Sequence, residues 1–387
     1  MLPGLDGSTR NKGGFMKGLS RSVIATLGAA AIAAGLTACG DSKTTTAASG
    51  SSTGASGTVT LRVGYVTTPQ HPYGIAIDAF TKEVASASGG KMAVEAIPNY
   101  TGGDAKLLDD VSGGTVEMAA VSTAVWDTKG VNVFQALQAP FLITNYPLDA
   151  SIIGGPVGIA MLSSPNGPAK LNLVGLGILE GGLRKPVGAK EPLTTPASFV
   201  GKKIRAPQSK VLAAGITALG ASPVALPVGD VYSALQNGTV DGMEANLGLI
   251  STNKYNEVAK FVTQNVNLWP FPAALVINKD QFDKLSADQK SVIQTAGGHL
   301  ATNSINVFLN PPAGATNFVT DLCGKGLTFA FASDADRVAL AKAEVPTYRQ
   351  LEADPEVAGF IKQIQDAKAA APPPAAPPPL PAGCKKV

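Results

Sequence analysis

Apolar and polar positions follow two alternating rhythms after residue 58. Residues 59–65 alternate between apolar and polar or small side chains, which is typical of a strand. From residue 75 apolar positions recur three and four residues apart until Gly89-Gly90, which predicts a helix. The pattern continues with a strand over 92–96, a short helix over 104–111 and a strand over 118–121.

The same order of elements returns in the second half of the chain. The predicted elements are a strand over 203–205, a helix over 210–219, a strand over 222–226, a helix over 229–236 and a strand over 240–243. The two regions share no literal repeat, which argues against a solenoid. We therefore predict an α/β fold with two lobes, each built on a parallel sheet.

Composition separates this body from the two ends of the chain. Residues 40–58 are mostly Ala, Ser, Gly and Thr, which cannot bury a core and predict a flexible tether. Residues 370–382 alternate alanine with proline triplets, which is typical of an extended or disordered tail. The 387 residues are 45% apolar and 15% charged, enough for the packed cores of two domains.

The net charge of +3 is located in the N-terminal segment. Residues 1–38 hold four basic residues and one acidic residue, and the rest of the chain holds 27 of each. A basic stripe of the kind that binds nucleic acid is therefore not predicted.

Residues 16–39 have the pattern of a secretory signal, with two basic residues before a short, alanine-rich apolar stretch. This stretch is too short for a membrane span of about 20 residues. Leu36-Thr37-Ala38-Cys39 resembles the lipobox of bacterial lipoproteins, which implies acylation of Cys39 and a lipid anchor outside the cytoplasmic membrane. A plain signal peptide with an incidental cysteine is the alternative. In either case, a leader of conventional length would start at Met16 rather than Met1.

Cysteine and histidine are too scarce to build a metal site. Cys323 and Cys384 could pair in an oxidising compartment, but Cys384 lies in the proline-rich tail, so we expect both thiols to be free. His71 and His299 are far apart in sequence. We predict neither a metal nor a cofactor.

Ligands of open α/β sheets bind outside the carboxyl ends of the strands, so residues that follow the predicted strands are the candidates for a site. They lack a nucleophile beside a general base, and they suit the binding of a small polar anion. The candidates are Tyr65, Thr67, Thr68, His71, Tyr73, Ser122, Thr123, Trp126, Arg205, Gln208, Glu244 and Asn246.

Three segments resemble the solute-binding proteins of tripartite ATP-independent (TRAP) transporters, the DctP-like family. They are Leu183-Arg184-Lys185-Pro186, Gly201-Lys202-Lys203-Ile204-Arg205-Ala206-Pro207, and Val231-Tyr232-Ser233-Ala234-Leu235-Gln236-Asn237-Gly238-Thr239-Val240-Asp241-Gly242. Their order and spacing carry the resemblance, which covers about residues 60–300 and continues weakly to 368. It implies two α/β lobes that close over a ligand about a hinge, with a long bracing helix.

With that fold, the chain divides into five parts. They are a signal peptide at 1–38, a tether at 39–58, a first lobe at 59–181 with about 271–310, a second lobe at 182–270 with about 311–368, and a tail at 369–387.

The resemblance assigns roles to two arginines. Arg205 corresponds to the arginine that pairs with the substrate carboxylate, and its guanidinium offers a planar fork that meets a carboxylate bidentately. Arg184 corresponds to a second arginine, which either contacts the ligand or braces the lobe.

Two positions depart from the family pattern. Ala245 stands where an asparagine is common, so the amide role passes to Asn246. Val228 replaces a residue that is often aromatic, which leaves Trp126 and Trp269 as candidate stacking surfaces or as core.

The sequence predicts a lipid-anchored receptor and not an enzyme. It would capture a small organic anion, C4-dicarboxylate-like or a related acid, and deliver it to the small and large membrane subunits of a TRAP transporter. A receptor for a membrane signalling partner or for an ATP-driven importer is the alternative. A secreted hydrolase or isomerase is disfavoured, because no base lies beside a nucleophile.

Overall fold

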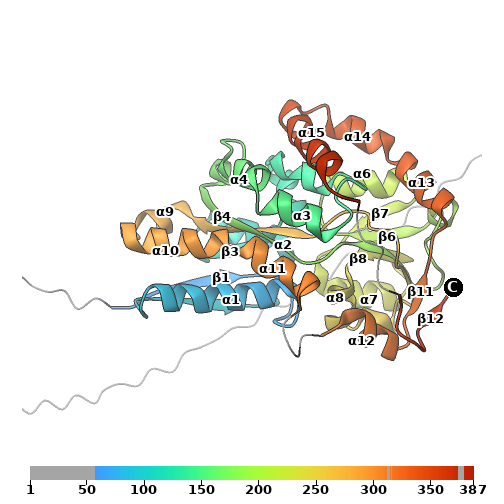
Figure 1. Ribbon diagram of the computed structural model, residues 1–387, viewed down its shortest axis with the longest axis horizontal. Coiled ribbons are helices and arrows are strands. Elements are labelled where there is room, and N and C mark those ends of the chain that lie inside the picture. The colour runs from blue at the N-terminus through green and yellow to red at the C-terminus, as the bar shows by residue number, and fades with distance from the viewer. Residues whose placement is uncertain (1–56, 312–313, 315, 374–378) are drawn as a thin grey trace, which may run out of the picture. The chain divides into compact units, whose positions relative to one another are not determined.

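The computed structural model describes residues 57–311, 314, 316–373 and 379–387. The predicted signal peptide, the acylation site Cys39 and all but the end of the tether lie outside these residues. The described elements form two sheets with helices packed around them (Figure 1), which is the predicted two-lobe α/β fold.

The first sheet has the strand order β2-β1-β3-β10-β4. Its members are β1 (Val59–Gly64), β2 (Met92–Ile97), β3 (Met118–Ser122), β4 (Leu173–Glu180) and β10 (Pro272–Asn278). Every residue of β3 and β10 is buried, as expected for strands covered on both faces.

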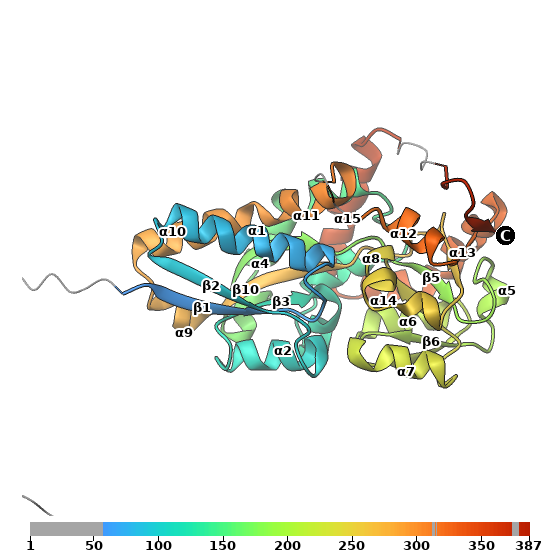
Figure 2. The same ribbon diagram turned by 90° about the horizontal axis from the view of Figure 1, so that it is seen from below.

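Helices cover both faces of this sheet (Figure 2). The helices α1 (Pro72–Ala87), α10 (Ala287–Gly298) and α11 (Leu300–Leu309) lie over one face, and α2 (Gly103–Ser112) lies over the other. Alternate side chains of β3 accordingly join different cores: Met118 and Ala120 pack in the cluster of α1, and Val121 packs in that of α2. α10 and α11 are separated only by His299, and their main contacts with other elements are with α1, α3 and β4 of the first lobe.

The second sheet has the order β12-β11-β9-β5-β8-β6-β7. Its strands are β5 (Lys185–Gly188), β6 (Lys203–Ala206), β7 (Ser222–Ala225), β8 (Gly242–Ala245), β9 (Phe261–Thr263), β11 (Thr328–Ala330) and β12 (Lys385–Lys386). The helices that follow these strands include α6 (Lys210–Ala218), α7 (Val231–Gln236), α8 (Leu247–Thr252) and α12 (Phe318–Gly324).

The expectation of purely parallel sheets was wrong. β1, β2 and β3 run parallel, but β10 runs antiparallel to both β3 and β4. In the second sheet β5 likewise runs antiparallel to β8 and β9. The cause is that the chain crosses from one sheet to the other between β4 and β5 and returns between β9 and β10, so these strands enter against the direction of their neighbours.

The two crossing segments pair with each other at a hinge. The backbone N–H of Gly181 donates to the Phe271 carbonyl at 2.9 Å, and that of Arg184 donates to the Trp269 carbonyl at 2.8 Å. Gly182 has φ +119°, and a Cβ there would come within 3.0 Å of Asn246 Cβ, so both backbone conformation and space require glycine.

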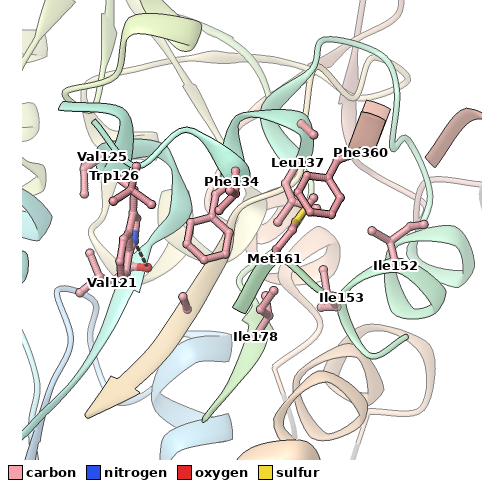
Figure 3. Packing of buried hydrophobic residues seen from close by; sticks show 14 of the residues in the cluster. Val121, Val125, Trp126, Phe134, Leu137, Ile152, Ile153, Met161, Ile178 and Phe360 are labelled. Atoms are coloured by element: carbon pink, nitrogen blue, oxygen red, sulfur yellow. Dashed lines mark hydrogen bonds between the residues drawn. The ribbon is translucent and has the colours of Figure 1, made fainter. Parts of the chain in front are cut away.

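The C-terminal helices contact both lobes. α13 (Asp334–Ala343) packs on α5 (Pro196–Phe199), and α14 (Val345–Leu351) packs on α6. The last helix, α15 (Pro355–Ala370), packs instead on the elements that follow β3, where Phe360 joins the core of Trp126, Phe134 and Leu137 (Figure 3).

The remaining helices are short. They are η1 (Thr123–Lys129), η2 (Val133–Gln138), α3 (Tyr146–Ile153), α4 (Pro156–Ser163), η3 (Pro168–Leu171), η4 (Val228–Asp230), η5 (Tyr255–Glu257) and α9 (Lys279–Asp283).

The expectation of two free thiols was also wrong. Cys323, at the end of α12, forms a disulfide with Cys384. The residues after Cys384 pair as β12 with β11, and Val387 exchanges two backbone hydrogen bonds with Phe329 and Phe331. The proline-rich composition predicted an extended or disordered segment over 370–382, and the residues that follow it form the edge strand of the second sheet.

Candidate functional site

A small cavity lies between the two lobes, where the carboxyl ends of strands from both sheets meet. It has a volume of about 10 Å³, about the room of one water molecule. Its lining combines apolar side chains with three charged ones. The lining residues are Val66, Thr67, Asp104, Arg184, Arg205, Pro207, Val228, Leu249 and Phe271.

Arg205 enters this cavity from β6 with part of its guanidinium uncommitted. Its Nε and Nη2 donate to the Leu226 carbonyl at 3.0 and 2.6 Å, and the residue is only 3% exposed. No carboxylate forms an ion pair with it among the residues that the structure describes, and Nη1 has no partner there. Burial lowers the pKa of Arg205 to about 10, so it stays charged at neutral pH. A buried, charged guanidinium without a counter-ion favours an anionic ligand.

Arg184 faces the same cavity but is held by protein groups. Its Nε and Nη2 contact the carboxylate of Glu244, the latter at 2.8 Å, and its guanidinium carbon lies 4.3 Å from the centre of the Phe271 ring. Nη1 is buried without a hydrogen-bond partner in the described part of the chain. Burial, and then the charge of Arg205, lowers the pKa of Arg184 to about 9. Arg184 therefore braces the second lobe through Glu244 and still offers one donor.

Asp104 stands in the first turn of α2, where a carboxylate also benefits from the helix dipole. The backbone N–H of Ser122 donates to its Oδ1 at 2.9 Å. Burial raises the pKa of Asp104 to about 6, opposed by that hydrogen bond and by the positive charges of Arg205 and Arg184. From sequence, Asp104 was predicted only as the start of a helix, although its position after a strand and Gly102-Gly103 is a signal that could have identified it as a site candidate.

Two polar atoms of the cavity lining, Thr67 Oγ1 and Arg184 Nη1, are buried without a hydrogen-bond partner among the residues that the structure describes. Thr68 Oγ1, His71 Nε2 and Asn246 Nδ2, which belong to residues outside the lining, are likewise buried without a partner there. Buried polar atoms are normally paired, so such a concentration marks a place where a ligand or water supplies the partners. Burial lowers the pKa of His71 to about 3, so its imidazole is neutral and can accept or donate one hydrogen bond.

His71 and Asn246 also begin helices on the two sides of the hinge. The Nδ1 atom of His71 accepts from the backbone N–H of Tyr73 at 3.2 Å and caps α1. The Asn246 Oδ1 accepts from Leu249 N–H at 2.7 Å and caps α8. Each side chain therefore has one atom committed to its helix, and the two side chains lie close enough together that a contact with Asn246 opposes the lowering of the His71 pKa.

The structure does not bring the other candidates to the cavity lining. Tyr65 and Trp126 belong to hydrophobic cores, and the Trp126 indole donates to the Val121 carbonyl at 3.4 Å. The Tyr73 hydroxyl donates to the Phe271 carbonyl at 2.8 Å, and Trp269 is buried with its indole directed to Glu244 at 3.3 Å.

Ser122 and Thr123 are likewise engaged within the protein. The Ser122 hydroxyl caps η1, and the Thr123 hydroxyl donates to the Pro272 carbonyl at 3.2 Å and accepts from Gln138 at 2.7 Å. The aromatic side chain in the cavity lining is that of Phe271, whereas Trp126 or Trp269 was the candidate stacking surface. Phe271 lies at the hinge, between the return crossing and β10, which no local pattern revealed.

The model of the family described as "bacterial extracellular solute-binding protein, family 7" matches residues 63–354. The chain belongs to this family. Among its relatives, the C4-dicarboxylate-binding periplasmic protein DctP of Rhodobacter capsulatus is 32% identical over 241 residues, which cover 62% of this chain and 70% of the relative. The 2,3-diketo-L-gulonate-binding periplasmic protein YiaO of Escherichia coli is 29% identical over 240 residues, or 61% and 71% of the two chains.

Solved structures agree with this assignment. The sugar acid binding protein DctPAm from Advenella mimigardefordensis, in complex with galactonate, aligns with a TM-score of 0.73 at 26% identity, over 81% of this chain and 99% of that one. A TRAP periplasmic solute-binding protein from Bradyrhizobium, in complex with galacturonate, aligns at 26% identity with a TM-score of 0.71, over 79% and 99%. This protein is thus a DctP-like, TRAP-type solute-binding protein, and the four relatives described above are named as binding proteins and not as enzymes.

Two further observations bear on this solute-binding protein. Within the described ranges, no helix is both long and apolar enough to span a bilayer. The same part of the chain holds no cluster of three or more His, Cys, Asp or Glu side chains that could bind a metal ion.

Proposed function

We propose that this solute-binding protein captures a small carboxylate-bearing anion between its two lobes and that Arg205 binds the carboxylate. The observation that carries the proposal is the charged guanidinium of Arg205, buried beside the cavity and without an acidic partner in the described chain. The names of its relatives support the ligand class, because a C4-dicarboxylate, 2,3-diketo-L-gulonate and galactonate all carry carboxylates.

Both lobes contribute residues to the cavity lining, which suits a protein that binds its ligand by closing about a hinge. Thr67 and Asp104 come from the first lobe, and Arg184 and Arg205 from the second. A ligand that contacts both sets favours the closed form over the open one, which is the differential affinity that a population shift requires. Closure would present a loaded shape to the small and large membrane subunits of a TRAP transporter.

Ligand class is tested by comparing acids with their uncharged analogues. Thermal unfolding of the purified protein should shift upward with an acid of the right size and not with its amide. A ligand at a hundredfold excess over its Kd adds about 2.7 kcal/mol to the free energy of unfolding. Equal shifts from acid and amide would remove the carboxylate requirement.

We also propose that Cys39 carries a lipid that anchors the receptor outside the cytoplasmic membrane. The support is the lipobox-like Leu36-Thr37-Ala38-Cys39 after a short apolar stretch. Stable anchoring needs more than one acyl chain, which lipoprotein acylation supplies. Cys39→Ser should move the protein from the membrane to the soluble fraction, and fractionation like that of the wild type would contradict the anchor.

A further inference from the structure

Asp104 places a negative charge in the same cavity as the two arginines. One of its oxygens accepts from Ser122 N–H, and no other residue in the described ranges donates to the second oxygen. Arg205 and Arg184 lie near enough to lower its pKa but form no ion pair with it. The carboxylate is thus fixed by the backbone with one oxygen free beside the cavity.

The charges around the cavity leave room for a single ligand carboxylate. Glu244 neutralises Arg184, with both side chains almost fully buried. Arg205 and Asp104 remain, one positive and one negative. A monocarboxylate on Arg205 leaves Asp104 as the only other charge, and a hydroxyl of the ligand can donate to its free oxygen. A dicarboxylate of similar length would bring a second negative charge toward Asp104, in a place of low dielectric where like charges repel strongly.

We propose that Asp104 determines specificity, making this site selective for hydroxylated monocarboxylates over dicarboxylates with the same carbon skeleton. The inference rests on the proposed function, since it requires that Arg205 bind the ligand carboxylate. It narrows the ligand class: Asp104 accepts a hydroxyl of the correct ligand and excludes the acid in which that end is oxidised to a carboxylate.

Protonation of Asp104 should weaken this selectivity. The charged and titratable groups that face it are Arg205 from β6, Arg184 before β5 and Tyr73 from α1. The pKa is about 10 for Arg205 and about 9 for Arg184, and that of Tyr73 is raised above its usual value. Of these four groups, only Asp104 therefore titrates near neutrality. Burial raises the pKa of Asp104 to about 6, so lowering the pH from about 8 to about 5.5 protonates most of this carboxylate in the ligand-free protein. The affinity for the hydroxy monoacid should then fall and that for the diacid should rise.

Matched acid pairs test the proposal by titration calorimetry on the purified protein. L-Threonate and L-tartrate share four carbons and differ in one terminal group, hydroxymethyl or carboxylate. D-Gluconate and D-glucarate form the same pair with six carbons. The wild type should bind the monoacid of at least one pair about tenfold or more tightly than its diacid. In Asp104→Asn this ratio should fall by at least about tenfold and lose its dependence on pH.

Asp104→Asn keeps the side-chain oxygen that accepts from Ser122, so the start of α2 should persist, and circular dichroism checks that it does. The matched control is Asp109→Asn on the same helix, whose carboxylate is 59% exposed and pairs with Lys129. It should leave both the ratio and its pH dependence unchanged.

The outcomes separate this inference from the proposed function. If neither monoacid binds more tightly than its diacid, or if Asp104→Asn leaves the ratio unchanged, Asp104 is not the specificity determinant. If only acids without hydroxyl groups bind, such as succinate or pyruvate, and binding needs Arg205, the proposed function stands and this inference fails. If no carboxylate in the panel binds, both fail.

Discussion

At the scale of single residues, the two arginines show how a partner decides the role of a buried charge. Arg184 and Arg205 are 1% and 3% exposed, and each retains an uncommitted donor. Arg184 is paired with Glu244 and stacked on Phe271, so its charge is stabilised within the lobe. Among the described residues, Arg205 has only the backbone carbonyl of Leu226 as a hydrogen-bond partner, so its charge is available to a ligand.

Loss of the Glu244 carboxylate should therefore destabilise the protein even without ligand. Glu244→Gln leaves the guanidinium of Arg184 buried without its counter-ion, which costs about 3–5 kcal/mol of the free energy of unfolding. Urea unfolding measures the change. The control is Asp78→Asn, which removes an exposed i,i+4 partner of Lys82 and should have a far smaller effect. If both variants lost the same free energy of unfolding, Glu244 would not be stabilising the buried charge of Arg184.

At the scale of elements, a pair of buried acids joins the hinge segments to α3. Glu180, at the end of β4, accepts from the backbone N–H groups of Gly182 at 2.6 Å and Phe271 at 2.9 Å. Asp149 of α3 faces Glu180, and both residues are fully buried. Burial, and then the charge of Glu180, holds the pKa of Asp149 well above its usual range. We therefore expect the pair to share one proton, while Glu180 links the two crossing segments.

This pair predicts a loss of stability as the pH rises. Both pKa values are raised in the folded protein, so the stabilising proton is fully bound below the unfolded pKa of about 4 and is lost as the pH approaches the folded value. Between these limits the wild type should lose about 1.4 kcal/mol of stability per pH unit relative to Asp149→Asn, which cannot ionise. Urea unfolding at a series of pH values tests this. Parallel curves for the two proteins would contradict the shared proton.

The elements that could be predicted from sequence are those with a local pattern. The strands and helices of the two βα runs belong to this group, because their apolar periodicity is local; β6, for example, differs from its prediction by one residue. The strand predicted over 240–243 instead spans Gly242–Ala245. The antiparallel entries of β5 and β10 depend on where the chain crosses between lobes, and β12 depends on the Cys323–Cys384 bond. Such long-range pairings leave no periodic signal.

At the scale of the molecule, the site combines a part that sequence revealed with a part that only folding assembles. Arg205 was proposed as a site residue from its motif and from its place at a strand's carboxyl end, and it lies in the cavity lining. Asp104 and Phe271 belong to segments far from it in sequence, and only the fold brings all three to one cavity. Tyr65 and Trp126 also follow or end strands, but they lie in the cores, because position along a strand does not tell which way a side chain faces.

The central claim is that Arg205 binds the carboxylate of the ligand between the lobes. The most direct measurement is titration calorimetry of wild type and Arg205→Ala with an acid that stabilises the wild type in the thermal screen, with Arg62→Ala, a change at a surface ion pair, as the control. Arg205→Ala should weaken binding by about 2–5 kcal/mol, because the ligand charge is left unpaired in a closed cleft, and Arg62→Ala should bind like the wild type. Unchanged affinity in Arg205→Ala would place the carboxylate elsewhere and contradict the account.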